Sequence, residues 1–334
     1  METCRNVRLG VLCGMSPRKF KELMTAVRCR RYGPPEVLEL VRVPKPTPRP
    51  DEICIRIHAS AATQSDAFIR SAAVGRTLQV PFRLMIGISR PRVAIVGFVF
   101  SGVVEAAGPQ TTRFAVGDEV YGMTGFRLGA YAQYRCMRES DSKKTGTVGL
   151  KPSSISHEEA TAVVYGGSLA VQYTDRGNIR PGRHVLIYGA SGTSGTIAVQ
   201  YAKSLGAHVT AVCSTANVDF VESLGADEVL DYTQTDAPPE GTRYDFVLDS
   251  VGGAKTSKLK EACRAFVKDG GTYVSIDDGN LELNSDRLEK IRGLVESGDI
   301  KPVVGSTFEL ADIAEAHRLV DTKHKRGGIA IVVP

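Results

Sequence analysis

Cysteine is scattered through this sequence, and no two cysteines stand at the spacing of a C-x-x-C motif. The seven are Cys4, Cys13, Cys29, Cys54, Cys136, Cys213 and Cys263. The missing motif argues against a structural zinc site and against a redox dithiol. An odd, irregularly spaced set also argues against the disulfide framework of a secreted domain. We therefore expect reduced thiols in a cytoplasmic protein.

Long apolar runs are missing too. The longest covers residues 93–104 and is interrupted by Gly97, Ser101 and Gly102. Because it is too short to span a bilayer, we expect no membrane segment. A buried strand pair or a kinked strand is the structure that this run predicts.

The excess of positive charge is small. The net charge is +5, and residues 1–23 hold five basic and two acidic side chains, so +3 of the total lies in this leader and +2 in the remaining chain. A nucleic-acid partner therefore has little support. The apolar core of the leader is short, so we expect a flexible extension rather than a signal peptide. An organelle-targeting leader is the alternative.

The stretch VLIYGASGTSG at 185–195 is the most informative in the chain. An apolar run ends in a turn of small residues, a helix is expected from about 196 to 205, and a second apolar run follows at 209–212. This is the context of a dinucleotide-binding turn, in which glycines admit a pyrophosphate and the free N–H groups of the helix attract it. The residues expected to contact the dinucleotide are Gly189, Ala190, Ser191, Gly192, Thr193, Ser194 and Gly195. A tight turn that binds another ligand, or none, is the alternative.

The pattern of elements divides the remaining chain into two domains. Short strands with turn signals begin near residue 24, whereas strands alternate with helices after residue 153, which predicts a parallel sheet covered on both faces. Ser154 is expected to cap a helix that runs through Val163. Two amphipathic helices, near 285–296 and 310–320, and a strand at 329–333 form the tail. We predict a flexible extension at 1–23, a β-rich domain made of 24–153 and 280–334, and a doubly wound cofactor domain at 154–279.

Five motifs carry a family resemblance: YGPPEVL (32–38), GDEV (117–120), YGASG (188–192), LGAD (224–227) and LDSVGG (248–253). Together they resemble the medium-chain dehydrogenase/reductase superfamily, and more narrowly its zinc-independent quinone oxidoreductase branch, which includes ζ-crystallin-like and enone reductases. The similarity covers roughly residue 24 to the end. It implies an α/β enzyme with a GroES-like β-rich catalytic domain and a Rossmann cofactor domain. It also implies a possible homodimer, since the family is often dimeric.

The resemblance also bears on zinc. Zinc-dependent members carry Cys where Thr63 stands, and Gly-His-Glu where this chain has Gly97, Phe98 and Val99. A hydroxyl and a phenyl ring cannot replace a thiolate and an imidazole as ligands, so we predict no metal. Without one, hydride is expected to go to an acceptor already activated by conjugation, a quinone or an α,β-unsaturated carbonyl.

Cofactor preference is set at the end of the second strand of the cofactor domain. NAD-preferring sites place Asp or Glu there, about 20 residues past the glycines, and this chain has Cys213, Ser214 and Thr215 instead. Nothing there repels a 2′-phosphate, and the two hydroxyls can donate to it, as can Asn217. We predict NADPH, with NADH possible because Ala216 replaces an Arg common in close relatives. A helix cap is the alternative role of the hydroxyls.

Further site residues follow from the resemblance. It implies Tyr232 on the adenosine phosphate side and Ser250, Val251 and Ser275 near the nicotinamide, at the carboxyl ends of strands where ligands bind in open sheets. Ordinary turn residues are the alternative.

The catalytic side is less specified. Thr63, Asp66 and Tyr165 are the candidates, and for Asp66 a structural hydrogen-bond acceptor is favoured over a proton shuttle. The branch usually has Asn at position 63, and some members have Tyr where Phe68 stands. These departures favour an altered acceptor or a feeble reductase.

Three functions stay open. The first is a zinc-independent NADPH-dependent reductase of quinones or enones, with a small-molecule acceptor as its partner. The second is a zinc-free alcohol or aldehyde reductase, and the third is a nucleotide-binding protein with little catalysis.

Overall fold

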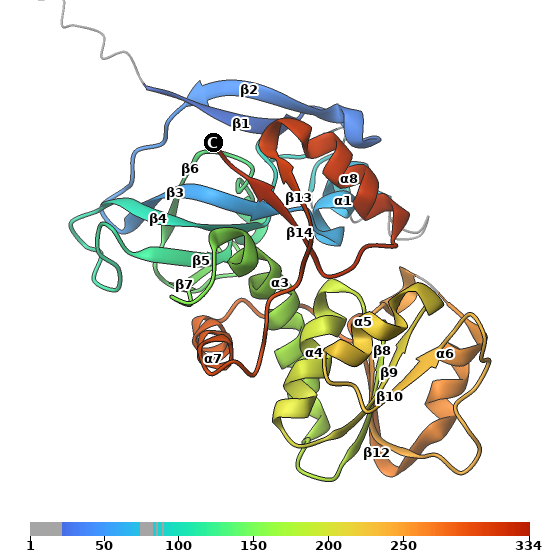
Figure 1. Ribbon diagram of the computed structural model, residues 1–334. Coiled ribbons are helices and arrows are strands. Elements are labelled where there is room, and N and C mark those ends of the chain that lie inside the picture. Colours follow the sequence, from blue (N-terminus) through green and yellow to red (C-terminus); the bar gives the residue numbers. More distant parts are fainter. Residues whose placement is uncertain (1–21, 74–82, 85, 89, 255) are drawn as a thin grey trace, which may run out of the picture.

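Strands from both ends of the chain form one seven-stranded sheet (Figure 1). The computed structural model describes residues 22–73, 83–84, 86–88, 90–254 and 256–334, so the predicted leader lies almost entirely outside the described residues. The strand order is β13-β14-β3-β4-β5-β7, and β6 pairs with β3. The strands are β3 (Glu52–Ala61), β4 (Val99–Ala107), β5 (Glu119–Met123), β6 (Tyr134–Arg138), β7 (Thr147–Leu150), β13 (Val304–Glu309) and β14 (Gly328–Val332). The antiparallel pairing of β14 with β3 returns the tail to this sheet.

A hairpin and two helices flank this sheet. The hairpin joins β1 (Leu23–Cys29) to β2 (Leu38–Pro44) and packs Met24 and Val43 against Ala132 in a small apolar cluster. Helices α1 (Gln64–Ser71) and α8 (Ile313–Thr322) contact each other beside the sheet. The expected helix near 310–320 begins with a short 3-10 turn at Leu310–Asp312 and becomes an α-helix only at Ile313.

Near-continuous apolar runs form a second sheet, in which all five strands are parallel. The order is β10-β9-β8-β11-β12, so the chain first moves outward from β8 on one side and then crosses to the other. The strands are β8 (His184–Tyr188), β9 (His208–Cys213), β10 (Glu228–Asp231), β11 (Tyr244–Asp249) and β12 (Val267–Ser275). Helices α4 (Thr193–Ser204), α5 (Val218–Ser223) and α6 (Lys258–Cys263) connect them. This doubly wound order confirms the predicted α/β fold class.

Helix α3 (His157–Thr174) lies between the two sheets (Figure 1). It is buried on nearly every side and contacts both α4 and the strands β3 and β14, as an apolar helix without a solvent face must. The predicted cap at Ser154 is wrong: Ser156 is the N-cap, and its side chain and that of Glu159 form a capping box. The predicted end at Val163 is also wrong, because apolar residues continue the buried face to Thr174.

The expectation for residues 93–104 is met only in part. The strand begins at Val99, and Gly97 interrupts the run with φ +100°, a conformation that L side chains rarely adopt. A Cβ on Gly97 would lie 2.4 Å from the Tyr131 nitrogen, so glycine is required where the two segments cross.

One apolar core holds the two sheets together. It runs from Ile187 in β8 through Val163 in α3 to Tyr121 in β5. The Tyr121 hydroxyl donates a hydrogen bond of 2.6 Å to the Leu288 carbonyl, which ties β5 to helix α7 (Ser285–Glu296). This core fixes the position of the two sheets relative to each other.

Candidate functional site

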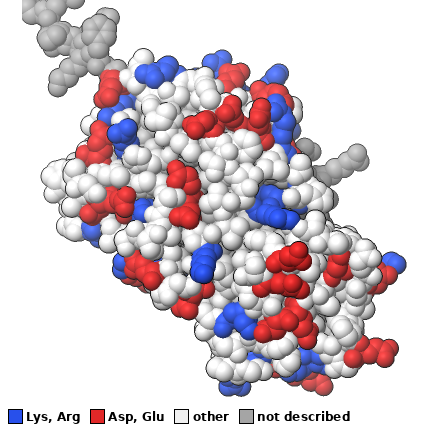
Figure 2. Space-filling view, viewed as in Figure 1, with Lys and Arg blue, Asp and Glu red and all other residues white. Residues whose placement is uncertain are grey.

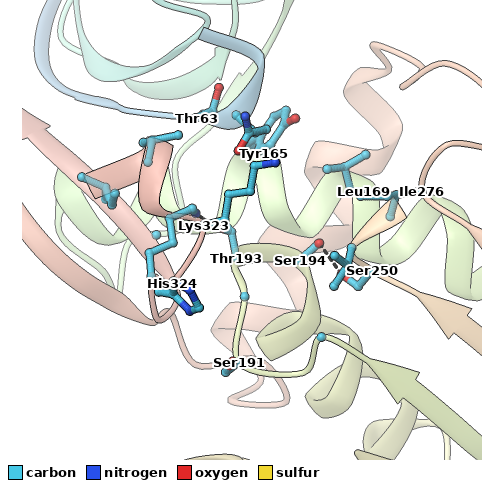
Figure 3. A pocket seen from close by; sticks show the side chains of 18 of the residues that line it. Thr63, Tyr165, Leu169, Ser191, Thr193, Ser194, Ser250, Ile276, Lys323 and His324 are labelled. Atoms are coloured by element: carbon cyan, nitrogen blue, oxygen red, sulfur yellow. Dashed lines mark hydrogen bonds between the residues drawn. The ribbon is translucent and has the colours of Figure 1, made fainter. Parts of the chain in front are cut away.

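A cavity lies where the carboxyl ends of β8, β9 and β11 face α1, α3 and the tail (Figure 3). Ligands of doubly wound sheets bind at this edge. Ten of the predicted cofactor residues line it: Gly189, Ser191, Gly192, Thr193, Ser194, Ser214, Asn217, Tyr232, Ser250 and Val251. Figure 3 shows Thr63 and Tyr165 at one end, Ser191 at the other and Thr193 between them. The predicted residues that do not line it are Ala190, Gly195, Thr215, Ser275 and Asp66.

The glycine turn gives the cavity its narrow backbone wall. Gly189 has φ +79°, and a Cβ there would lie 2.4 Å from the Val251 side chain. Gly192 is the N-cap of α4 and has no side chain that could occupy the N–H groups of the first turn. The helix begins at Thr193, three residues before the expected start. Its free N–H groups face the cavity and suit an anion.

Two residues of the glycine turn, Ala190 and Gly195, contribute to packing and do not line the cavity. Ala190 is fully buried. A Cβ on Gly195 would lie 2.1 Å from the Gly189 carbonyl oxygen, so glycine is needed to let α4 approach β8. These two positions shape the turn without facing a ligand.

The tail crosses the glycine turn and adds a cation to it. Gly327 donates its N–H to the Ser191 carbonyl at 2.9 Å, and the Thr193 hydroxyl donates to the Gly327 carbonyl at 2.7 Å. The Lys325 ammonium donates to the Thr193 hydroxyl oxygen and, at 3.2 Å, to the Gly327 carbonyl. Burial lowers the pKa of Lys325 to about 8. A titratable cation thus stands at the start of α4, where a pyrophosphate would bind.

A second tail cation reaches the end of β9. Arg326 donates from Nε to Oδ1 of Asn217 at 2.5 Å and from Nη2 to the Ala216 carbonyl. Its guanidinium carbon also lies 5.6 Å from the centroid of the Phe220 ring. Asn217 in turn donates to the Ser214 hydroxyl at 3.0 Å. A guanidinium is therefore present beside Ala216, although the chain has no arginine at that position.

Thr215 turns away from the cavity. Its hydroxyl donates to the Asp231 carboxylate at 2.5 Å and lies 2.9 Å from the Thr233 hydroxyl. Burial opposes the shift, but hydrogen bonds from Thr215 and Thr233 lower the pKa of Asp231, so this carboxylate is ionised at neutral pH. The neighbouring strand β10 thus brings an ionised carboxylate to Thr215, just past the end of β9.

The cavity narrows between α4 and the end of β11. The Ser194 and Ser250 hydroxyls are 2.6 Å apart (Figure 3), and Val251 donates its N–H to the Asp249 carboxylate at 3.1 Å. Ser275 is buried and donates to the same carboxylate at 3.3 Å. Ser275 therefore supports the β11 turn, and its neighbour Ile276 lines the cavity in its place.

Thr63 and Asp66 form the cap of α1. The Thr63 hydroxyl donates to Asp66 Oδ2 at 2.6 Å, and the Asp66 N–H donates back to the Thr63 hydroxyl oxygen at 3.2 Å. Burial raises the pKa of Asp66 to about 6, against the effect of its hydrogen bonds. Thr63 lines the cavity, whereas Asp66 is buried behind it. The spacing T-x-x-D was the sequence signal for this capping box.

Tyr165 is a polar side chain of α3 at the end of the cavity near Thr63. Its hydroxyl lies 2.9 Å from the Ser65 hydroxyl, and its ring meets the Phe98 ring edge-on at 6.0 Å. Burial raises the pKa of Tyr165, so the hydroxyl stays protonated at neutral pH and can donate a hydrogen bond.

Several lining residues were missed by sequence reasoning. They are Gln64, Thr161, Leu169, Thr256, Val320, Lys323, His324 and Lys325. The tail members carried no motif, and only the expected docking of the last strand indicated that this segment would approach a domain.

The described part of the chain offers neither a metal-binding cluster nor a membrane-spanning helix. Within it, no group of three or more His, Cys, Asp or Glu side chains could hold a metal ion. No described helix has the length and hydropathy to cross a membrane. Figure 2 shows acidic and basic side chains interspersed over the visible face.

Three family models match the chain. The model described as "Alcohol dehydrogenase GroES-like domain" matches residues 49–149, and two described as "Zinc-binding dehydrogenase" match 195–293 and 279–331.

Named relatives match along most of their length. The chain is 30% identical to "NAD(P)H oxidoreductase RTN4IP1, mitochondrial" of Bos taurus, over 95% of this chain and 91% of that protein. It is 27% identical to "NADPH-dependent alkenal/one oxidoreductase, chloroplastic" of Arabidopsis thaliana, over 90% and 77%. Among solved structures, the quinone oxidoreductase of Coxiella burnetii matches with a TM-score of 0.80 and 26% identity, over 94% of this chain and 100% of that one.

Proposed function

The chain belongs to the medium-chain dehydrogenase/reductase superfamily, in its quinone oxidoreductase branch, and on this basis we propose an NADPH-dependent reductase that transfers hydride to a quinone or an α,β-unsaturated carbonyl without zinc. The family makes it an oxidoreductase that uses a nicotinamide cofactor. One observation carries the finer proposal: a single cavity joins the glycine turn to the Tyr165 hydroxyl.

The residues present fit a dinucleotide. Gly189 and Gly192 keep the backbone wall free of side chains, the first turn of α4 offers N–H donors, and Lys325 adds a cation. When bound, the reduced nicotinamide supplies the hydride. The chain binds and orients the dinucleotide, and its packed walls exclude water from the acceptor end.

Selection of NADPH rests on Arg326. Its guanidinium is held beside Asn217 and Ala216, and a guanidinium can bind a 2′-phosphate with charge-assisted hydrogen bonds. The ionised Asp231 lies behind Thr215 and opposes the phosphate. We propose a preference for NADPH that these two opposite charges limit.

The residues at the zinc-ligand positions do not fit a metal. Thr63 uses its hydroxyl to cap α1, and Phe98 packs its ring against Tyr165. Neither side chain offers the thiolate or imidazole that zinc needs. The proposal therefore contains no step through a metal.

The acceptor would lie between the nicotinamide end of the cavity and Tyr165. Hydride addition to a conjugated acceptor leaves negative charge on an oxygen. The protonated Tyr165 hydroxyl, held by Ser65, can donate a hydrogen bond to that oxygen. Leu169 and Ile276 supply apolar surface against a ring or alkenyl chain.

The test is the rate of NADPH oxidation by the purified protein with panels of quinones, alkenals, aldehydes and alcohols. Turnover with quinones or alkenals supports the proposal. Turnover confined to aldehydes or alcohols would establish the zinc-free alcohol or aldehyde reductase. Tight NADPH binding without any turnover would establish a nucleotide-binding protein instead.

We also propose a homodimer through β12. It is one of the two terminal strands of the described five-stranded sheet and, at Val267–Ser275, longer than the other, β10; a terminal strand presents backbone groups that another chain can pair with. Light scattering should give twice the mass of 35.9 kDa; a single-chain mass at micromolar concentration contradicts the dimer.

For location, we propose the cytoplasm, with an organelle as the alternative because relatives are named mitochondrial and chloroplastic. Fluorescent fusions with and without residues 1–23 distinguish the two, since only a targeting leader would move the full-length fusion into an organelle.

A further inference from the structure

Cys54 and Cys136 lie directly opposite each other on the adjacent antiparallel strands β3 and β6. Opposite residues in such a pair have Cα atoms about 4.5 or 5.5 Å apart, and both distances lie within the roughly 4.4–6.8 Å that a disulfide needs. Opposite side chains share one face of the sheet, so both sulfur atoms point to the same side. The register therefore places the two thiols next to each other across the strand pair.

The surroundings make one sulfur accessible and keep the other protected. Cys54 is 2% exposed, whereas Cys136 is partly exposed and lines a hollow beside Met24 and Val43. This hollow is bordered by the β1–β2 hairpin, which lies above β3 and β6 in Figure 1. A small solute can therefore reach the pair from the surface.

We propose that Cys54 and Cys136 are a reversible redox site, at which a small hydroperoxide forms a cross-strand disulfide that a thiol reductant opens. The site is separate from the cofactor cavity, since neither cysteine lines it. It does not depend on the proposed hydride transfer.

The pair has an electronic asymmetry that suits this reaction. The adjacent Cys136 thiol, with the nearby Lys45 ammonium, lowers the pKa of Cys54 against the effects of burial and Glu105. Cys54 is therefore the better thiolate, and Cys136 holds the proton. By contrast, burial alone dominates at Cys213 and raises its pKa to about 11.

The chemistry balances in two steps. The Cys54 thiolate attacks hydrogen peroxide; an S–O bond forms, the O–O bond breaks, and hydroxide leaves and takes up a proton as water. The Cys136 sulfur then attacks the Cys54 sulfur; the S–S bond forms, the S–O bond breaks, and the Cys136 proton leaves in a second water. Two thiols are oxidised to one disulfide, and one peroxide is reduced to two waters.

The experiment exposes the full-length protein to a small excess of hydrogen peroxide, blocks the remaining thiols, digests at acid pH and maps linked peptides by mass spectrometry. The Cys54–Cys136 link should rise at least severalfold over the untreated protein and disappear after dithiothreitol. Cys213 and Cys263 should remain free thiols after peroxide, so that both are recovered as alkylated, unlinked peptides when the protein is denatured and blocked.

Two variants sharpen the result. Cys136→Ser should abolish the link and leave a sulfenic acid on Cys54 that a dimedone probe captures. Cys213→Ser, the matched control at another buried cysteine, should leave the link unchanged. The proposal is overturned if wild-type Cys54 and Cys136 both stay alkylatable after peroxide, if Cys54 passes to sulfinic acid without a link, or if cysteines link indiscriminately. The wild-type result stands whether or not a variant folds.

Discussion

The Arg326 guanidinium donates a hydrogen bond from Nε to Oδ1 of Asn217 at 2.5 Å, although 109 residues separate the two along the chain. The bond carries the tail to the end of β9. It also holds a positive charge beside Ala216, in a segment that has no basic side chain among residues 213–217. The tail thereby reaches the cavity as well as the first sheet.

Replacement of this arginine should alter cofactor selection. In Arg326→Ala we expect KM for NADPH to rise about tenfold, because a charge-assisted hydrogen bond contributes about 1.5–3 kcal/mol. KM for NADH should change little, since NADH has no 2′-phosphate. Steady-state kinetics with NADPH and with NADH measure the two KM values. Arg318→Ala, which removes an exposed guanidinium paired with Glu36, is the matched control. Equal losses with NADPH and NADH would contradict a role in selection.

The opposite change should follow from loss of the Asp231 charge. Asp231→Asn keeps an oxygen that accepts from Thr215 but removes the ionised carboxylate. We expect KM for NADPH to fall about twofold to fivefold, which is the size of a partly screened charge interaction. Asp236→Asn, at an exposed carboxylate paired with Lys258, should have no effect. Weaker NADPH binding in Asp231→Asn would show that the carboxylate does not oppose the phosphate.

Cofactor binding should depend on the ionisation of Lys325. Burial lowers its pKa to about 8, so the side chain is cationic below that pH and neutral above it. The cationic form attracts a pyrophosphate, so Kd for NADPH and NADH alike should increase as pH rises through about 8. Fluorescence titration at several pH values measures this increase.

The variant Lys325→Met removes that charge. Both dissociation constants should rise about tenfold at neutral pH and lose their dependence on this ionisation. Lys301→Met, at an exposed lysine whose backbone alone is hydrogen-bonded to Gln200, is the control. An unchanged pH profile in Lys325→Met would assign the ionisation to another group.

Loss of the Tyr165 hydroxyl should slow the chemical step. In Tyr165→Phe we expect kcat to fall at least about tenfold with a smaller change in KM, because the donor acts mainly on charge that develops in the transition state. Ser65→Ala should give a smaller decrease, since Ser65 only holds the Tyr165 hydroxyl. Tyr173→Phe, on the same helix but outside the cavity, is the control. Full activity of Tyr165→Phe would place the donor elsewhere.

The parts of the site that sequence could predict are local. Gly189, Gly192 and Gly195 stand within seven residues: Gly189 has φ +79°, Gly192 is the N-cap of α4, and a Cβ on Gly195 would meet the Gly189 carbonyl oxygen. The Thr63–Asp66 cap is equally local and follows from a three-residue spacing. Ser154 was the exception, since two nearby serines could both cap α3 and only the partner of Glu159 does so.

The remaining features depend on residues that meet only after folding. Thr215 has hydroxyl chemistry suited to a phosphate, yet it donates to Asp231 because β9 and β10 are neighbours in parallel register. Cys54 and Cys136 are far apart in sequence, and only the register of β3 with β6 makes them a pair.

The amino-acid sequence by itself determined the glycine turn and the alternation of strands with helices, because these follow from local spacing and periodicity, and its motifs resembled those of the family. Tertiary structure alone decided which charges lie at the cavity and which thiols meet. The physical reason is range: hydrogen bonds and charge pairing act over a few ångströms, and only the docking of the tail brings Lys325 and Arg326 that close to the turn.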